Sequence, residues 1–246
     1  MYNNSLVLLG PTGWGTGVGP RRSFIVAVLG QALGAATSNM EPVSLGLEEF
    51  IYITALYLAL SAAKISLPIS VVSYAMSTYR VEAISLWLTS PLFAFFALAF
   101  CKVLKGGGGL SLPTLFVLMY LFGYNNLALF SHNLVTTVVA ATIGTYMGLS
   151  YSRWVVDLVA LRPRTTVSIN LTMIVGALAA SLIQVPLSFT LVAYSALLTA
   201  SSRYKIRVIR IEKFIKAYIG IMLALFFASI FPFLKSLLQY LAPQAS

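Results

Sequence analysis

Few residues in this chain have side chains that could carry out chemistry. Its 246 residues include one histidine, one cysteine and six acidic residues. Acid–base or nucleophilic catalysis needs several such groups in one place, and a metal site needs a cluster of ligands. The sequence contains no such set, so we expect neither enzyme activity nor a metal or other cofactor.

The remaining candidates are polar residues at the ends of long apolar segments, where each is costly unless it is paired or faces water. Glu48 and Glu49 begin one segment, either as carboxylates favoured at a helix N-terminus or as an acidic entrance for cations. Asn125, Asn126 and His132 lie where two other consecutive apolar segments meet, at their outer ends. They form either a short external hairpin or, if the chain re-enters the membrane there, a polar constriction. All five are candidates for lining a path.

Arg153 and Asp157 are two further path-lining candidates. Their spacing of four places them on one face of a helix, where they can pair. The surrounding run, LSYSRWVVDL, resembles the helix of rotary ATP synthase subunit a that carries its essential arginine four residues before an asparagine. Asp157 stands where that family has the asparagine. The resemblance implies a membrane subunit of a rotary ATPase, with Arg153 as its essential residue.

Positively charged residues are concentrated in the segment 201–216. Six cations and one acid are interleaved with apolar residues, which fall on one stripe if the segment is helical. This pattern predicts an amphipathic helix on the inner face of a membrane, bound to anionic lipid headgroups. Docking of a partner is the alternative, and nucleic acid is possible but has no motif to support it. The cations are Arg203, Lys205, Arg207, Arg210, Lys213 and Lys216.

The composition predicts a chain that lies in a bilayer. Hydrophobic residues make up 59% and charged residues 9% of the sequence, and the mean hydropathy is +0.90. A soluble domain has roughly a quarter charged residues. A membrane-crossing helix needs roughly 17 to 25 apolar residues. Two regions are ambiguous. The region 65–79 is short and contains Pro68, so it is either a brief span or a re-entrant segment. The region 166–201 is either two short spans broken near Pro186 or one kinked helix. The clear windows are 23–40, 45–63, 83–101, 110–131, 133–152 and 217–241.

Charge distribution decides between these alternatives, because loops on the inner face are enriched in Lys and Arg. If both ambiguous regions cross, Arg80 and Lys235 lie outside and the other fourteen of the sixteen cations lie inside. We therefore predict an all-α, polytopic transmembrane helix bundle with seven to nine crossings, nine being favoured, and no soluble domain. Residues 1–22 would be a Gly-rich tail and 23–246 a single membrane domain. A plasma membrane and an organellar inner membrane fit equally well.

Two motifs of the form GxxxG predict close helix packing, because glycine lets two backbones approach. They are Gly30 with Gly34, and Gly144 with Gly148. The partner helix can belong to the same chain or to another subunit, so a homo-oligomer or a complex with other membrane subunits is compatible with them.

Two functions fit this sequence. The first is a channel or carrier in a transport or translocation system, conducting a solute or ion. Interrupted segments near Pro68 and Pro186 favour it, since discontinuous helices build binding sites within the membrane. The alternative is a structural, membrane-embedded subunit of a larger machine for secretion, DNA transfer, respiration or rotary ATP synthesis. The lack of a soluble domain and the basic segment favour that alternative.

Overall fold

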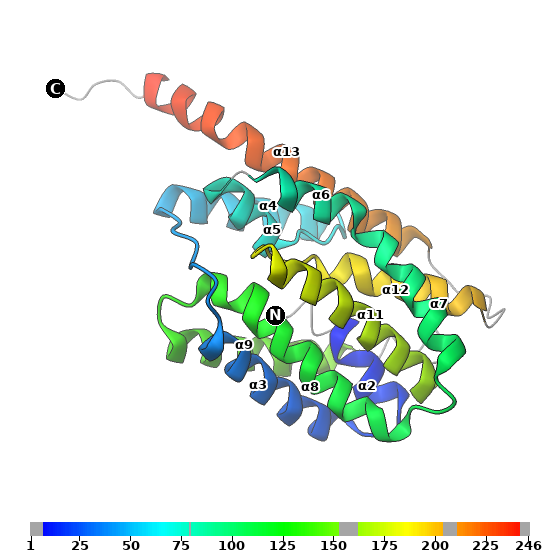
Figure 1. Cartoon of the computed structure of the whole chain (residues 1–246). Helices are drawn as coiled ribbons and strands as arrows, with labels where there is room; N and C mark the ends of the chain where they lie inside the picture. The colour runs from blue at the N-terminus through cyan, green and yellow to red at the C-terminus, as the bar shows by residue number, and fades with distance from the viewer. Residues whose placement is uncertain (1–6, 79, 153–161, 204–210, 242–246) are drawn as a thin grey trace.

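The computed structural model of the chain describes residues 7–78, 80–152, 162–203 and 211–241, and every regular element in these ranges is helical (Figure 1). The predicted all-α architecture is confirmed for this part of the chain. The elements are α2 (Gly10–Gly15), α3 (Pro20–Thr37), α4 (Leu47–Ala62), α5 (Ile69–Ser77), α6 (Val81–Thr89), η1 (Ser90–Phe93), α7 (Ala94–Val103), η2 (Gly108–Leu110), α8 (Ser111–Phe122), η3 (Gly123–Leu127), η4 (Ala128–Phe130), α9 (Leu134–Tyr151), α11 (Pro163–Leu182), α12 (Phe189–Arg203) and α13 (Ile211–Leu241).

Four helical stretches in the described ranges are long and apolar enough to cross a membrane. Two shorter apolar helices, Leu134–Ser150 and Phe189–Ala200, accompany them. Four is fewer than the predicted seven to nine, and several helices in the expected regions are shorter than the 18 residues that a crossing helix needs here. For example, α4 has 16 residues and α5 only nine. The four stretches are Val81–Val103, Gly108–Phe130, Pro163–Leu182 and Phe214–Leu237.

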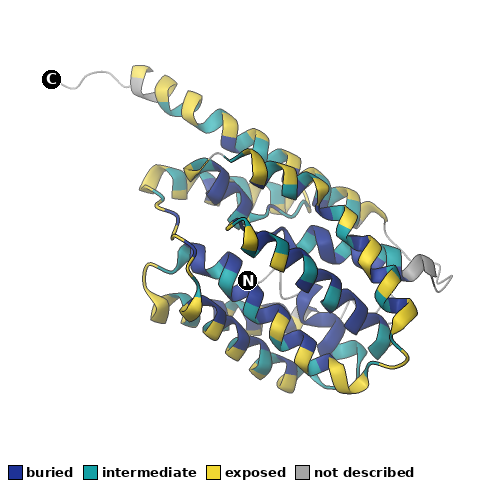
Figure 2. Cartoon of the chain, viewed as in Figure 1, coloured by how far each residue is buried: buried dark blue, intermediate teal, exposed yellow. Residues whose placement is uncertain are grey.

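Buried residues gather between the central helices, and exposed residues lie on the outer faces of the bundle (Figure 2). Many of the exposed residues are large and apolar. Ile25 and Leu29 on α3, and Val135 and Val139 on α9, are more than half exposed. In water, such a large apolar surface marks an interaction site or an aggregation hazard. In hydrocarbon it is the expected exterior, so this distribution agrees with a membrane protein.

Helix α3 packs closely against α8 through its glycine motif. A Cβ atom on Gly30 would lie 2.9 Å from the carbonyl oxygen of Phe116, and one on Gly34 would lie still closer to that of Tyr120. The two backbones therefore meet within this chain. Helix α9, which contains the buried Gly148, also packs against α3.

The N-terminal region, from residue 7, is part of the helical bundle. Residues 7–9 are almost completely buried, and α2 packs against α3, α8 and α11. The Trp14 indole N–H donates a hydrogen bond to the Ser152 hydroxyl at 2.9 Å, and the Asn170 amide donates to the Thr12 hydroxyl at 3.3 Å. From residue 7 onward, the described part of this region therefore packs against the other helices, and the division into a tail over 1–22 and a membrane domain over 23–246 stays a prediction.

Two helices end in the same unusual way. After α4 and after α11, one residue adopts a positive φ, Lys64 at 59° and Gln184 at 52°. These are the non-glycine residues with positive φ in the part of the chain that the structure describes. The next N–H bonds back to the helix in both cases, Ile65 to Leu60 O at 2.8 Å and Val185 to Ala180 O at 3.0 Å. The chain is then extended until α5 or α12 begins.

Each of these features of the first break recurs in the second break 120 residues later in the sequence. Pro68 O accepts hydrogen bonds from the N–H groups three and four residues later, and Ser188 O does the same. The chain thus contains two copies of a helix–break–helix unit. Leu58, Ala59, Ser61, Leu67, Val72 and Tyr74 match Leu178, Ala179, Ser181, Leu187, Val192 and Tyr194.

Candidate functional site

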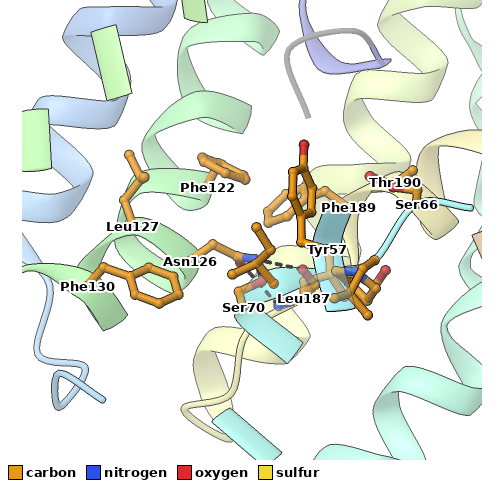
Figure 3. A pocket seen from close by; sticks show the side chains of 14 residues that line it. Tyr57, Ser66, Ser70, Phe122, Asn126, Leu127, Phe130, Leu187, Phe189 and Thr190 are labelled. Carbon is orange, nitrogen blue, oxygen red and sulfur yellow. Dashed lines mark hydrogen bonds between the residues drawn. The ribbon is translucent and has the colours of Figure 1, made fainter. Parts of the chain in front are cut away.

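The two breaks meet at a cavity of about 310 Å³. Figure 3 shows the side chains around it, which come from α4, α5, α8, η3, η4, α12 and the two extended segments. Hydroxyl groups are prominent, and no described residue that lines the cavity has a charged side chain. The polar lining residues are Tyr57, Ser66, Ser70, Asn126, Ser188 and Thr190.

Asn126 holds the two breaks together. Its Nδ2 donates to the Ser70 hydroxyl at 2.7 Å and to Leu187 O at 2.9 Å, while its Oδ1 accepts from Leu187 N at 3.2 Å (Figure 3). The residue is 3% exposed. Extended backbone away from water needs partners for its N–H and C=O groups. The amide of Asn126 supplies a donor and an acceptor for the backbone of Leu187, and it also bonds to Ser70, just after the other break.

Asn125 forms hydrogen bonds with α11, the helix that precedes the second break. Its Nδ2 donates to Ala177 O at 2.9 Å, and its Oδ1 accepts from the Ser181 hydroxyl at 2.9 Å. Both asparagines lie in η3, a single π-helical turn that follows α8. Such turns frequently occur at functional sites, since the extra residue redirects side chains that a regular α-helix would place elsewhere.

The electrostatics of the cavity come from helix ends. Ile69 and Ser70 begin α5, Phe189 and Thr190 begin α12, and all four line the cavity. The N-terminus of a helix carries about half a positive charge from its unpaired N–H groups. Two such ends at one uncharged cavity, together with serine and threonine hydroxyls, form a site rich in hydrogen-bond donors.

The asparagine and histidine candidates are separated. Asn125 and Asn126 are buried within the helical stretch from α8 to η4, rather than at the tip of an external hairpin. His132 is exposed, and its Nε2 lies 3.0 Å from Val43 O. It does not line the cavity.

Glu48 and Glu49 lie in the first turn of α4, away from the lining of the cavity. The Lys235 ammonium on α13 is 3.0 Å from Glu48 Oε2 and 3.2 Å from Glu49 Oε1. These acids therefore connect α4 to α13 through one shared cation.

Several candidates lie outside the described residues. Arg153 and Asp157 are among them, so the resemblance to the ATP synthase helix stays a prediction. So does lipid or partner binding by the basic segment. Lys216 lies in α13 and pairs with Glu212, four residues earlier. Lys205, Arg207 and Arg210 lie outside the described ranges, and the side chains of Arg203 and Lys213 are not described.

Sequence reasoning missed the hydroxyl residues of the cavity, chiefly Ser70, Ser188 and Thr190. Each lies within four residues of Pro68 or Pro186, the prolines that indicated the interrupted segments. Polar residues that flank a proline inside an apolar segment were therefore the available signal.

Comparison with known proteins identifies no relative: no family model, curated protein or solved structure matches this chain.

Proposed function

We propose that this protein is a membrane carrier for a small anion, which binds in the cavity between the two breaks. The observation that carries the proposal is the meeting of two helix N-termini at one cavity whose described lining includes hydroxyl groups and no charged side chain.

The broken helices support transport within a membrane. Irregular backbone at membrane depth is tolerated where it is buried in protein or lines a cavity. Carriers of several folds place their substrate at discontinuous helices contributed by repeated units. Here each of two similar units supplies one break to the same cavity. The proposal retains seven to nine crossings, with interrupted helices counted as parts of the membrane domain.

The donor groups favour an anion over a cation. Helix N-termini stabilise negative charge, and hydroxyl groups can donate hydrogen bonds to an oxyanion in place of water. A cation would face the positive ends of α5 and α12, with no carboxylate among the described lining residues to offset them.

Flux into liposomes tests the proposal. Purified protein is reconstituted, and uptake of radiolabelled phosphate, sulfate and chloride is compared with uptake of sodium and of a neutral sugar. We expect saturable uptake of at least one anion, reduced at least tenfold in Ser70→Ala and Thr190→Val. Ser150→Ala is the matched control, because Ser150 is exposed on α9 and bonds only locally to Tyr146 O.

Two results would contradict the proposal. One is anion uptake no faster than in protein-free liposomes while the protein remains folded. The other is saturable uptake of sodium or sugar that the same two substitutions abolish, which would assign the cavity to a different solute.

A further inference from the structure

A second cavity, of about 370 Å³, lies at the opposite end of α5. Residues from the C-terminal part of α5 line it, together with Glu41, Arg80 and Gln184. Gln184 is the residue at which the second break starts, whereas Leu187 and Ser188, further along the same break, line the central cavity. The same extended segment therefore borders both cavities.

Three side chains from the first half of the chain donate hydrogen bonds to this segment. Arg80 Nη1 donates to Ile183 O at 3.2 Å, and the Tyr74 hydroxyl donates to Gln184 O at 3.3 Å. The Trp87 indole N–H donates to Pro186 O at 2.7 Å, and its ring meets that of Tyr74 edge-on.

These bonds satisfy carbonyl groups that the end of a helix leaves without partners. A cation at a helix C-terminus is also favoured by the helix dipole, so Arg80 stabilises the end of α11 as well as bonding to it. The contacts hold the second break against α5 and α6, which belong to the other half of the chain.

The two halves are not equivalent in this respect. A shift of 120 residues places Tyr194 at the position of Tyr74, but Ala200 at the position of Arg80. Ala200 is fully buried, and its methyl group can donate no hydrogen bond. In the described part of the chain, the cationic contact made by Arg80 therefore has no equivalent at position 200.

We infer that Tyr74, Arg80 and Trp87 form a latch that closes the route between the second cavity and the central cavity. This inference rests on the proposed carrier function, in which the route opens during transport. Trp87 is buried, whereas 39% of the Arg80 side chain is exposed, so Arg80 can exchange its carbonyl partner for water. Opening of the latch then exposes the central cavity to the face on which Arg80 lies, the outer face in the predicted topology.

Accessibility of a cysteine in the central cavity measures the state of the latch. Cys101, the chain's one cysteine, is replaced by alanine, and Ser188, which is 4% exposed, is replaced by cysteine as a reporter. A membrane-impermeant thiol reagent is added to one side of proteoliposomes at a time. We expect Arg80→Ala and Tyr74→Phe to increase the labelling rate at least fivefold from the Arg80 side and to leave the rate from the other side unchanged.

Glu82→Gln is the matched control. It removes the ion pair to Arg80 Nε, at 3.8 Å, and leaves the donors to Ile183 and Gln184 in place. We expect its labelling rate to equal that of the parent. Tyr74→Phe removes a single hydroxyl group, so it tests the latch even if Arg80→Ala fails to fold.

Labelling and flux separate the two proposals. Unchanged labelling in both latch variants, or an equal increase from both sides, would overturn the latch even if anion flux is normal. A one-sided increase in a protein that transports no anion would support the latch and refute the carrier.

Discussion

The Asn126 side chain makes three hydrogen bonds, one to a hydroxyl and two to the backbone of a single residue. An asparagine amide has two donor hydrogens and one acceptor oxygen, which is the complement of a peptide group. A hydroxyl or a carboxylate at this position would satisfy only part of the set. This matching of groups explains why an asparagine occupies a site surrounded by apolar helices.

Replacement of Asn126 by alanine tests its structural role. Leu187 N–H and C=O would be left buried without their partner, and each such group costs about 1–3 kcal/mol. We therefore expect Asn126→Ala to lower the free energy of unfolding by about 2–6 kcal/mol in total. Thermal unfolding in detergent, followed by tryptophan fluorescence, measures the shift.

Asn133→Ala is the control for that substitution. Asn133 caps exposed helix α9 by accepting from Thr136 N at 3.2 Å, and loss of such a cap costs about 1 kcal/mol. Equal shifts for the two variants would mean that the bonds of Asn126 contribute no more than an ordinary helix cap.

At the scale of elements, close backbone packing fixes α3 relative to the helix that carries the site. A side chain on Gly34 would meet the backbone of Tyr120 and Tyr124, which cannot move independently of α8 and η3. The GxxxG spacing predicted close packing, but it did not say which helix would be the partner.

Ordinary overpacking of a core lowers the free energy of unfolding by about 1–3 kcal/mol. We expect a larger loss for Gly34→Ala, because the added methyl group meets backbone atoms rather than a movable side chain. Gly106→Ala is the matched control, since a Cβ there has open space around it. The melting temperatures of the two variants in the same detergent provide the measurement. Equal melting temperatures would show that α3 can shift away from α8 at little cost.

Glu48 and Glu49, at the start of α4, connect this helix to α13 through Lys235. Glu48, Glu49 and Lys235 are partly exposed, and exposed ion pairs contribute about 0–1 kcal/mol. We expect Glu48→Gln and Glu49→Gln to leave transport unchanged within twofold, because neither residue lines the cavity. Loss of liposome flux in either variant, with unchanged melting temperature, would instead restore the interpretation of an acidic entrance.

At the scale of the whole molecule, the repeated unit accounts for the position of the cavity. Two helix–break–helix units each contribute an extended segment and the start of a helix. A carrier built in this way contains its complete path in one chain, whereas a structural subunit of a larger machine would need other chains to be active.

Native mass distinguishes these two functions. The protein is extracted in mild detergent from the membranes in which it is made, its mass is measured, and co-purifying chains are identified. The carrier proposal predicts a single chain or a small homo-oligomer that retains anion flux when reconstituted. Recovery only with other membrane subunits, and no flux from the isolated chain, would favour the larger machine.

The amino-acid sequence determined the class of the protein and the location of its interruptions. Apolar content and segment length predict helices for a membrane, because these properties depend only on local composition. Pro68 and Pro186 marked the two interrupted regions, since proline disturbs a helix wherever it occurs inside one.

Only the tertiary structure decided which polar residues meet. Asn126 is 56 residues from Ser70 and 61 from Leu187 along the chain, and His132, only six residues away, lies elsewhere. Local periodicity contains no information about such pairings, because they follow from how several helices pack together. The burial of residues 7–13 has the same origin: a Gly-rich sequence has no strong local preference, and its position is set by the helices that surround it.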